Sequence, residues 1–424
     1  MIWMVDEDSS YKIKLNSSSF INPFLETVKG NLGVLILTSG LWNFAGSLTG
    51  PFETLYLLGL GANYVYIGFL ASIWSFVRIF SLLFGGSLAD KIGRRPLLVY
   101  LSFALSAESL YMASIPDWRY VIIQRVFDGI ISGLRGPSFS AIIADSIPLK
   151  RRAMGYALWQ IIPPIFGLFS PLIAGNIIDV KGVVSAMRIF YLVVFFFSFT
   201  ACLIRWKFIK ETFKFKLESN ESRSKLSLRD VLQPIREMNV SLKAWLFMSF
   251  LGGIFSSAAA PYWVDYAVNV VGISKGGWGL IDTSRRALNL AVTPIFASLS
   301  DRYGRLKFII PILFISPIVN VGFTYSHSFR DIYLWLLLAT FFSSISSPSL
   351  SALMADYTPR KMRGRISAYF NILGSIANVI GGFLGGYIYQ NISKGFVFIL
   401  ISISGWIIAF MAIIFFKEPK ERFE

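Results

Sequence analysis

Long apolar runs separated by short polar segments set the pattern of this chain. A helix needs about 20 mostly apolar residues to cross a bilayer. Twelve stretches meet that length: residues 32–58, 65–88, 97–115, 118–144, 153–177, 186–208, 244–270, 277–299, 308–326, 332–355, 366–390 and 396–416. Only a short turn at Gly59, Gly61 and Asn63 separates the first two. The pattern predicts an all-α integral membrane protein with twelve transmembrane helices.

Composition agrees with a lipid environment. Of the 424 residues, 54% are hydrophobic and 16% are aromatic, which is more apolar surface than a soluble globular protein carries. The single Cys202 excludes an intrachain disulfide, and the single His327 excludes a His-rich metal cluster. We therefore expect no metal and no cofactor. The acidic first residues and the lack of an apolar run before Leu32 argue against a cleaved signal peptide.

The net charge of +16 follows the expected topology. Segments on the same side as the two termini hold 29 of the 40 basic residues, counting Arg205 among them, whereas the opposite side holds six. Because basic residues collect in cytoplasmic loops, this asymmetry places both termini in the cytoplasm of a multi-pass protein of the cell membrane. The same distribution makes a nucleic-acid partner unnecessary, and anchoring to anionic lipid explains the basic loops.

Two motifs recur at one constant spacing. GSLADKIGRR at Gly86–Arg95 reappears as ASLSDRYGRL at Ala297–Leu306, and PSFSAIIADSIP at Pro137–Pro148 reappears as PSLSALMADYTP at Pro348–Pro359. Both offsets are 211 residues. A constant offset indicates a duplicated unit, and an even number of helices per unit gives both copies the same orientation in the membrane.

The repeat divides the chain into five parts. We expect a cytoplasmic N-terminal tail (residues 1–30), a six-helix bundle (31–208), a charged cytoplasmic linker (209–243), a second six-helix bundle (244–416) and a cytoplasmic C-terminal tail (417–424). The linker is rich in Ser and Lys and is expected to be either a short amphipathic helix on the membrane surface or a tether.

The loop after the second helix resembles a signature of the major facilitator superfamily (MFS). The matching residues are Gly86, Asp90, Gly93, Arg94 and Arg95 in the first half, and Asp301, Gly304 and Arg305 in the second. Glycine permits the tight turn, and arginine can reach a carboxylate or a lipid phosphate. The resemblance implies the twelve-helix MFS fold and a latch that steadies the outward-facing state.

Charged residues within the fourth helix form one stripe. Arg125, Asp128 and Arg135 fall within an arc of roughly 80° at about 100° per residue. Ionisable groups in membrane helices rarely face lipid and often mark a solute path. Arg125 to Gly129 also resembles the Arg-x-x-x-Gly signature that the superfamily associates with proton-coupled transport.

A second group of polar residues completes the predicted central cavity. On the eighth helix, Asp282, Arg285, Arg286 and Asn289 share an arc of about 100°. Other spans contribute Asn43, Glu53, Arg78, Glu108 and Gln160, of which Glu108 lies on a helix that the superfamily places at the periphery. Structural pairing, such as Arg125 with Asp128 or Arg285 with Asp282, is the alternative interpretation of the charges.

These residues suggest a secondary transporter that works by alternating access. The deep arginines outnumber the deep carboxylates, and guanidinium groups bind carboxylate or phosphate in a bidentate manner, so we expect an organic anion as the solute. Arginine does not titrate, so Glu53 or Asp128 is the expected proton carrier. The partners are then a small-molecule solute, a proton or other coupling ion, and the bilayer, with no nucleic acid, and the chain is expected to be a monomer.

Several alternatives stay open or are weakened. A drug/proton antiporter of the superfamily usually has a Gly-Pro pair on the fifth helix, where this chain has Ser170-Pro171, and only fragments of sugar-porter signatures are present. A transporter-like sensor that moves no solute has the same sequence features. The chain lacks the phosphate-binding motif of an ATP-driven pump and any nucleophile or metal motif of an enzyme, so we expect no enzymatic activity.

Overall fold

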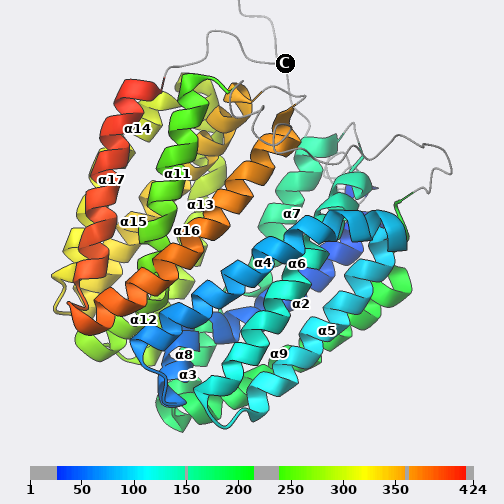
Figure 1. The fold of residues 1–424 in the computed structure, drawn as a ribbon, viewed down its shortest axis with the longest axis horizontal. Coiled ribbons are helices and arrows are strands. Elements are labelled where there is room, and N and C mark those ends of the chain that lie inside the picture. Colours follow the sequence, from blue (N-terminus) through cyan, green and yellow to red (C-terminus); the bar gives the residue numbers. More distant parts are fainter. Residues whose placement is uncertain (1–25, 149–150, 214–237, 359–361, 417–424) are drawn as a thin grey trace, which may run out of the picture.

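The computed structural model describes residues 26–148, 151–213, 238–358 and 362–416, and every regular element in these ranges is a helix. The helices form two bundles, one from each half of the chain (Figure 1). The bundles meet at the end where α3 and α12 lie and diverge toward the opposite end (Figure 1).

The first bundle contains six membrane-crossing segments, three of them interrupted or preceded by short turns. In chain order these are α2 (Asn31–Thr49), η1 (Gly50–Phe52) and α3 (Glu53–Gly59); α4 (Tyr64–Ile92); α5 (Arg94–Ser114); η2 (Trp118–Tyr120) and α6 (Val121–Ser146); α7 (Arg152–Phe166) and α8 (Ser170–Lys181); and α9 (Val183–Phe208). Pro51 and Pro171 lie in the first turn of η1 and α8, positions that need no backbone N–H.

The second bundle repeats this plan. It consists of α11 (Val240–Ala259) with η4 (Ala260–Tyr262), α12 (Trp263–Asp265) and the π-helical η5 (Tyr266–Val270); α13 (Lys275–Tyr303); α14 (Leu306–Thr324); α15 (Phe329–Tyr357); α16 (Arg363–Asn391); and α17 (Phe396–Phe415). Helix α11 begins four residues before the boundary expected from the sequence.

The twelve-helix prediction is confirmed. Ten segments of the described chain are long and apolar enough to cross a membrane. The other two are α6 and α13, which are as long as the rest but carry the charged stripes. The short turn predicted at Gly59–Asn63 is also present, with Gly61 at φ +88° and the Asn63 side chain capping α4.

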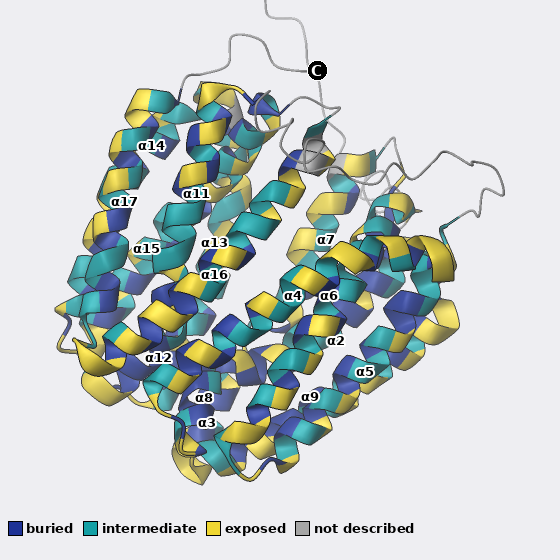
Figure 2. Cartoon of the chain, viewed as in Figure 1, coloured by how far each residue is buried: buried dark blue, intermediate teal, exposed yellow. Residues whose placement is uncertain are grey.

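Large apolar side chains cover the outside of the bundles. Phe84, Phe196, Phe410 and Ile414 are each more than 60% exposed. Figure 2 shows exposed positions along outer helices such as α17 and α5, with buried positions concentrated between the helices. A soluble protein rarely exposes so much apolar surface, so these faces contact lipid.

Glycines bring the two bundles into backbone contact at one end. A methyl group at Gly68 of α4 would lie 2.1 Å from the carbonyl oxygen of Gly382 of α16, and one at Gly386 would lie 2.7 Å from that of Tyr64. On the other flank, a methyl group at Gly279 of α13 would lie 2.2 Å from the carbonyl oxygen of Pro171 of α8. Gly68 and Gly279 are 211 residues apart, so the duplication produces both contacts. We call these two contacts the glycine seal.

Hydrogen bonds reinforce the glycine seal. The carboxylate of Asp265 is fully buried and accepts hydrogen bonds from Tyr64 (3.3 Å) of the first bundle and from Tyr389 (2.7 Å) and Asn269 (2.6 Å) of the second. On the other flank, Asp179 of α8 accepts hydrogen bonds from the backbone N–H groups at the start of α13. A carboxylate at a helix N-terminus is favourable, so this contact also joins the bundles.

Replacing Gly68 with alanine should open the glycine seal. The added methyl group forces α4 away from α16 at a cost of about 1–3 kcal/mol, which shifts the population toward a state open at this end by roughly five- to 150-fold. Spin labels at Tyr120 and Tyr325, exposed positions on the two bundles near the seal, should report longer distances. Gly46→Ala is the control, because nothing lies within 4 Å of a methyl group there. Unchanged distances in Gly68→Ala would contradict this account of the seal.

Candidate functional site

Two cavities lie between the bundles. The larger, of about 580 Å³, borders the glycine seal and is lined by residues of both halves, including Glu53, Arg125, Trp263 and Arg285. The smaller, of about 370 Å³, is lined by Gln160, Asp282, Arg285, Arg286 and Asn289 together with Pro164, Leu290, Thr340 and Ser343. Arg285 lines both cavities, which together form the candidate solute site.

An ion pair from the first bundle lies in the larger cavity. The η1 turn ends α2 and places Glu53 at the start of α3, where its Oε1 lies 2.5 Å from Nη2 of Arg125 on α6. The side chains are 16% exposed for Arg125 and 33% for Glu53, so solvent reaches the carboxylate more easily. The alternative interpretation paired Arg125 with Asp128. In the structure Arg125 pairs with Glu53 instead.

The arginines of α13 differ in their partners. Arg286 forms an ion pair with Asp282 one helical turn away (2.9 Å) and also donates to Ser47 of the first bundle (2.8 Å). Arg285 donates its Nε to the hydroxyl of Thr340 (2.9 Å) and has no carboxylate within ion-pair distance among the described residues. Asp282 forms its ion pair with Arg286 and not with Arg285, although it lies within electrostatic reach of both, so Arg285 has no direct counter-ion where the two cavity linings meet.

Aromatic side chains form much of the remaining wall. Trp74, Trp263 and Trp278 line the larger cavity. Trp263 is held by the rings of Phe323 and Phe398, each with its centroid 4.6 Å away. The indole N–H of Trp278 and Nε of Arg125 have no acceptor among the described groups. The lining thus combines flat apolar surfaces with donors that lack acceptors.

Four predicted residues lie outside both cavity linings: Asn43, Arg78, Asp128 and Arg135. Asn43 donates to the backbone of Ser39 within α2, and Arg78 packs its guanidinium 5.3 Å from the ring centre of Trp74. Asp128 lies within electrostatic reach of Arg125 and Arg135 but does not line either cavity. The contact of these residues with solute therefore stays a prediction.

Arg135 belongs to a separate cluster that sequence reasoning missed. It donates to the hydroxyl of Ser102 (3.2 Å), and Arg205 of α9 donates to the same oxygen (3.3 Å). Arg205 is only 1% exposed and also donates to Thr38 (2.9 Å) and Ser39 (3.2 Å) of α2. The expectation that Arg205 is a cytoplasmic anchor is therefore wrong, because hydroxyls of α2 and α5 hold its guanidinium inside the bundle.

The predicted latch is joined within each half. Arg94 forms an ion pair with Asp145, and Arg305 forms the equivalent pair with Asp356. Gly93 and Gly304 both have φ near +100°, a conformation that other residues rarely adopt, which explains the glycines of the motif.

The remaining latch residues lie at the ends of the same helices. Arg95 donates to the carbonyl of Trp206 (2.6 Å), and its backbone N–H donates to Glu211 (2.9 Å). Gly86 lies two turns before the end of α4, with open space around its Cα. Asp90 is exposed and forms no ion pair with a described residue, while the side chain of Asp301 lies outside the described part. The Asp90 side of the latch is therefore disengaged where the bundles diverge.

Other lining residues were not singled out from the sequence. Trp278 is one of them, and Asn320 and Ser257 are two more. Ser257 donates a hydrogen bond to Asn378, which also lines this cavity. Asn320 carried a usable signal, since it is an isolated amide within the otherwise apolar helix α14. Trp278 and Ser257 carried none, because both residue types are common in membrane helices that only pack.

Comparisons with known sequences agree with this geometry. The sequence profile of the Major Facilitator Superfamily matches residues 20–284 and 245–423. The chain is similar to the multi-drug resistance efflux pump PmrA of Streptococcus pneumoniae, with 25% identity over 84% of this chain and 88% of that protein. It is also similar to the multidrug resistance protein MdtG of Klebsiella pneumoniae, with 27% identity over 88% of this chain and 90% of that protein.

Solved structures share the fold. The xylose transporter XylE from E. coli in an inward-open conformation has a TM-score of 0.69 and 17% identity, covering 92% of this chain and 96% of that one. The human organic anion transporter MFSD10 has a TM-score of 0.64 and 16% identity, covering 90% of this chain and 98% of that one. At these identities the comparison concerns architecture alone.

Breaking the Glu53–Arg125 pair from one side should destabilise the protein. Glu53→Gln leaves Arg125 without its counter-charge and should cost about 2 kcal/mol, less than a fully buried pair because Glu53 is partly exposed. Arg125→Gln should behave alike, and the double variant should lose less than the sum of the two. Thermal unfolding in detergent measures each. The control is Glu26→Gln, which removes an exposed pair with Arg151 and should cost under about 1 kcal/mol. Strict additivity would rule out the coupling.

Proposed function

The chain belongs to the Major Facilitator Superfamily, and on that basis we propose that it exports amphipathic organic anions across the cell membrane by alternating access. The bundles rock about the two cavities, the glycine seal closes one face, and the latch residues close the other. The similarity to the efflux pump PmrA supports export as the direction. The protein acts as a monomer with both termini in the cytoplasm.

The observation that carries the anionic substrate is the position of Arg285. It lines both cavities and forms no ion pair with a described carboxylate, Asp282 acting on it only at longer range, whereas Arg125 and Arg286 are each paired. A guanidinium without a direct counter-ion attracts a carboxylate, sulfonate or phosphate, and its planar fork orients that group. Trp263 and Trp278 offer apolar faces for the rest of the solute. The site thus suits a flat organic anion.

A second candidate is a proton-driven exporter of lipophilic cations. The similarity to the multidrug resistance proteins PmrA and MdtG favours a broad range of drug substrates. The carboxylate of Glu53 in the larger cavity is a counter-charge for such a cation, provided that the cation displaces Arg125. The cation would gain a pair with Glu53 only by breaking the pair of Glu53 with Arg125. We therefore expect the cation to bind more weakly than an anion would bind at Arg285.

Coupling to protons would use the carboxylates beside Arg125. Glu53 is paired with Arg125, and Asp128 lies within electrostatic reach of both. A proton on Glu53 would release Arg125 toward the cavity, and loss of the proton would recapture it. A proton on Glu53 would thus favour an anion at Arg125 but compete with a cation at Glu53, so proton cotransport would suit an anionic solute and proton exchange a cationic one.

Neutralising Arg285 should selectively impair anion transport. Transport of fluorescein by Arg285→Gln in proteoliposomes should fall roughly tenfold to 100-fold, because one charge-assisted contact of about 1.5–3 kcal/mol is lost. Uptake of the lipophilic cation tetraphenylphosphonium, measured alongside, should not fall.

The control for this experiment is the double variant Glu26→Gln/Arg151→Gln, which removes an exposed ion pair outside both cavities. It should stay within about threefold of the wild type, since the net charge of the cavity is unchanged. Transport of tetraphenylphosphonium but not fluorescein by the wild type would refute the anion proposal in favour of the second candidate.

Asp128→Asn should uncouple transport from the proton gradient. The variant should lose accumulation of solute driven by an imposed gradient, because one proton-binding carboxyl is gone, yet retain exchange of labelled for unlabelled solute. Both are measured in the same proteoliposomes, and Glu53→Gln tests the other carboxylate in parallel. Accumulation that persists in Asp128→Asn would assign coupling elsewhere.

A further inference from the structure

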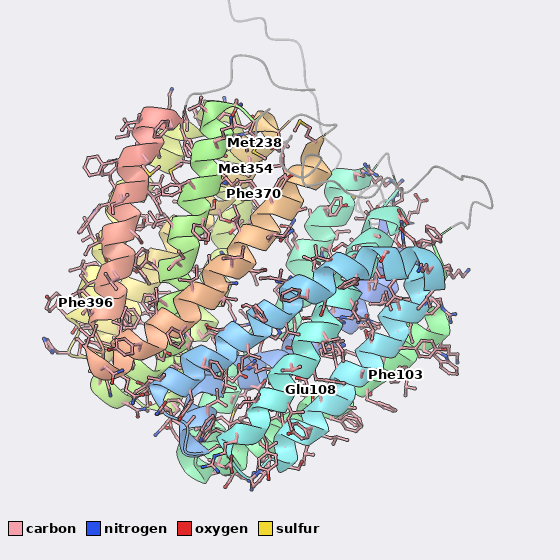
Figure 3. All side chains as sticks on the ribbon, in the orientation of Figure 1. Phe103, Glu108, Met238, Met354, Phe370 and Phe396 are labelled. Atoms are coloured by element: carbon pink, nitrogen blue, oxygen red, sulfur yellow. The ribbon has the colours of Figure 1, made fainter. Side chains whose placement is uncertain are left out.

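A third cavity lies away from the solute site, between α5 and α6. It measures about 280 Å³ and is lined by Glu108 with Ala104, Ala107 and Tyr111 of α5, and by Ile123, Gln124 and Phe127 of α6. Figure 3 labels Glu108 on the first bundle, on the side of α6 away from the second bundle. Neither the transport proposal nor the ion pair at Arg125 uses this carboxyl group.

The cavity opens toward lipid. Ile123 is 61% exposed and Phe127 is 42% exposed, and both belong to the outer surface of the bundle. Arg125 lies between them in sequence and lines the central cavity, so at about 100° per residue its two neighbours point to the opposite face of α6. A solute dissolved in the bilayer can therefore reach Glu108 without entering the central cavity.

Two hydrogen-bond acceptors at this cavity have no donor among the described groups. Nε2 of Gln124 donates to Oε1 of Glu108, which leaves Oε2 of Glu108 and Oε1 of Gln124 buried and without a partner among the described groups. A buried polar atom without a partner costs about 1–3 kcal/mol. Both open positions are acceptors, so the missing group is a donor with at least two N–H or O–H bonds.

The local charge also selects a cation. The charged groups within electrostatic reach of Glu108 are Asp128, Glu53 and Arg125, and only the last is positive. With Glu108 ionised, the cluster has a net negative charge. A protonated primary amine supplies both the positive charge and the N–H donors, and an alkyl or aryl tail would fill the apolar part of the cavity.

We propose that the cavity at Glu108 is a binding site for amphiphilic primary ammonium ions that enter sideways from the bilayer. The volume of about 280 Å³, at about 30 Å³ for each water-sized group, suits an amine with roughly nine heavy atoms, such as octylamine. The ammonium donates to Glu108 Oε2 and Gln124 Oε1, and the chain lies against Ala107, Ile123 and Phe127. This site goes beyond the proposed transport function and does not depend on it.

The test measures thermal stabilisation of the purified protein in phosphatidylcholine nanodiscs by three probes with an eight-carbon chain. Octylamine has the charge and several N–H donors, octyltrimethylammonium has only the charge, and octanol has one O–H donor and no charge. Octylamine should stabilise the wild type at concentrations at least about tenfold lower than the other two, since it alone satisfies both acceptors. Equal responses to octylamine and octyltrimethylammonium would overturn the proposal.

Variants locate the effect. Glu108→Gln keeps the shape of the cavity but removes the charge and should abolish the preference for octylamine, whereas Asp117→Asn, which removes a carboxylate between α5 and α6 outside the cavity, should retain it. The melting temperature of each variant without probe shows whether it is folded. An unchanged octylamine response in Glu108→Gln would refute the site.

Nanodiscs that contain phosphatidylethanolamine test the source of the amine. If this lipid removes the octylamine response of the wild type, its headgroup occupies the site, and the assignment to free amines is overturned. If the response persists, the site prefers small amines over the headgroup, as proposed.

Discussion

The closed end of this protein depends on helices that touch through their backbones. Successive glycines of α16 contact different helices. Gly381 and Gly385 face carbonyl groups of α11 in their own bundle, whereas Gly382 and Gly386 face α4 of the other bundle. Helix α16 is thus packed at backbone distance on two sides at once. Any side chain at these positions separates either the helices of one bundle or the two bundles, so the geometry of the cavities behind them follows from the absence of four Cβ atoms.

Charge distribution gives these symmetric bundles different chemistry. The residues 211 positions after Glu53 and Arg125 are Val264 and Leu336, and the residue 211 positions before Arg285 is Trp74. The duplicated frame places all of these at the same cavity, but each half contributes a charge where the other contributes an apolar or aromatic wall. The scaffold is therefore symmetric and the site is not, as a solute without twofold symmetry requires.

Much of the architecture was predictable because apolar length and the internal repeat act over long stretches of chain. The twelve spans, the turn at Gly61 and the presence of Arg125, Arg285 and Gln160 at cavities followed from that pattern. The partners of individual charges did not follow. Arg205 reads as a loop anchor at the end of an apolar run, yet three hydroxyls on α2 and α5 accept its hydrogen bonds. Such partners depend on helix rotation and spacing, which no single helix encodes.

The duplication of the glycine seal also affects whether ions can leak across the membrane through this protein. Its two flanks are related by the internal repeat, so one rotation of rigid bundles separates or joins both together. A form with one flank open and the other shut would need a bundle to bend, and its packed helices resist this. Water and ions would leak through such a form and discharge the membrane potential. The two flanks of the glycine seal therefore open and close together, which lets solute cross the membrane without a leak of ions.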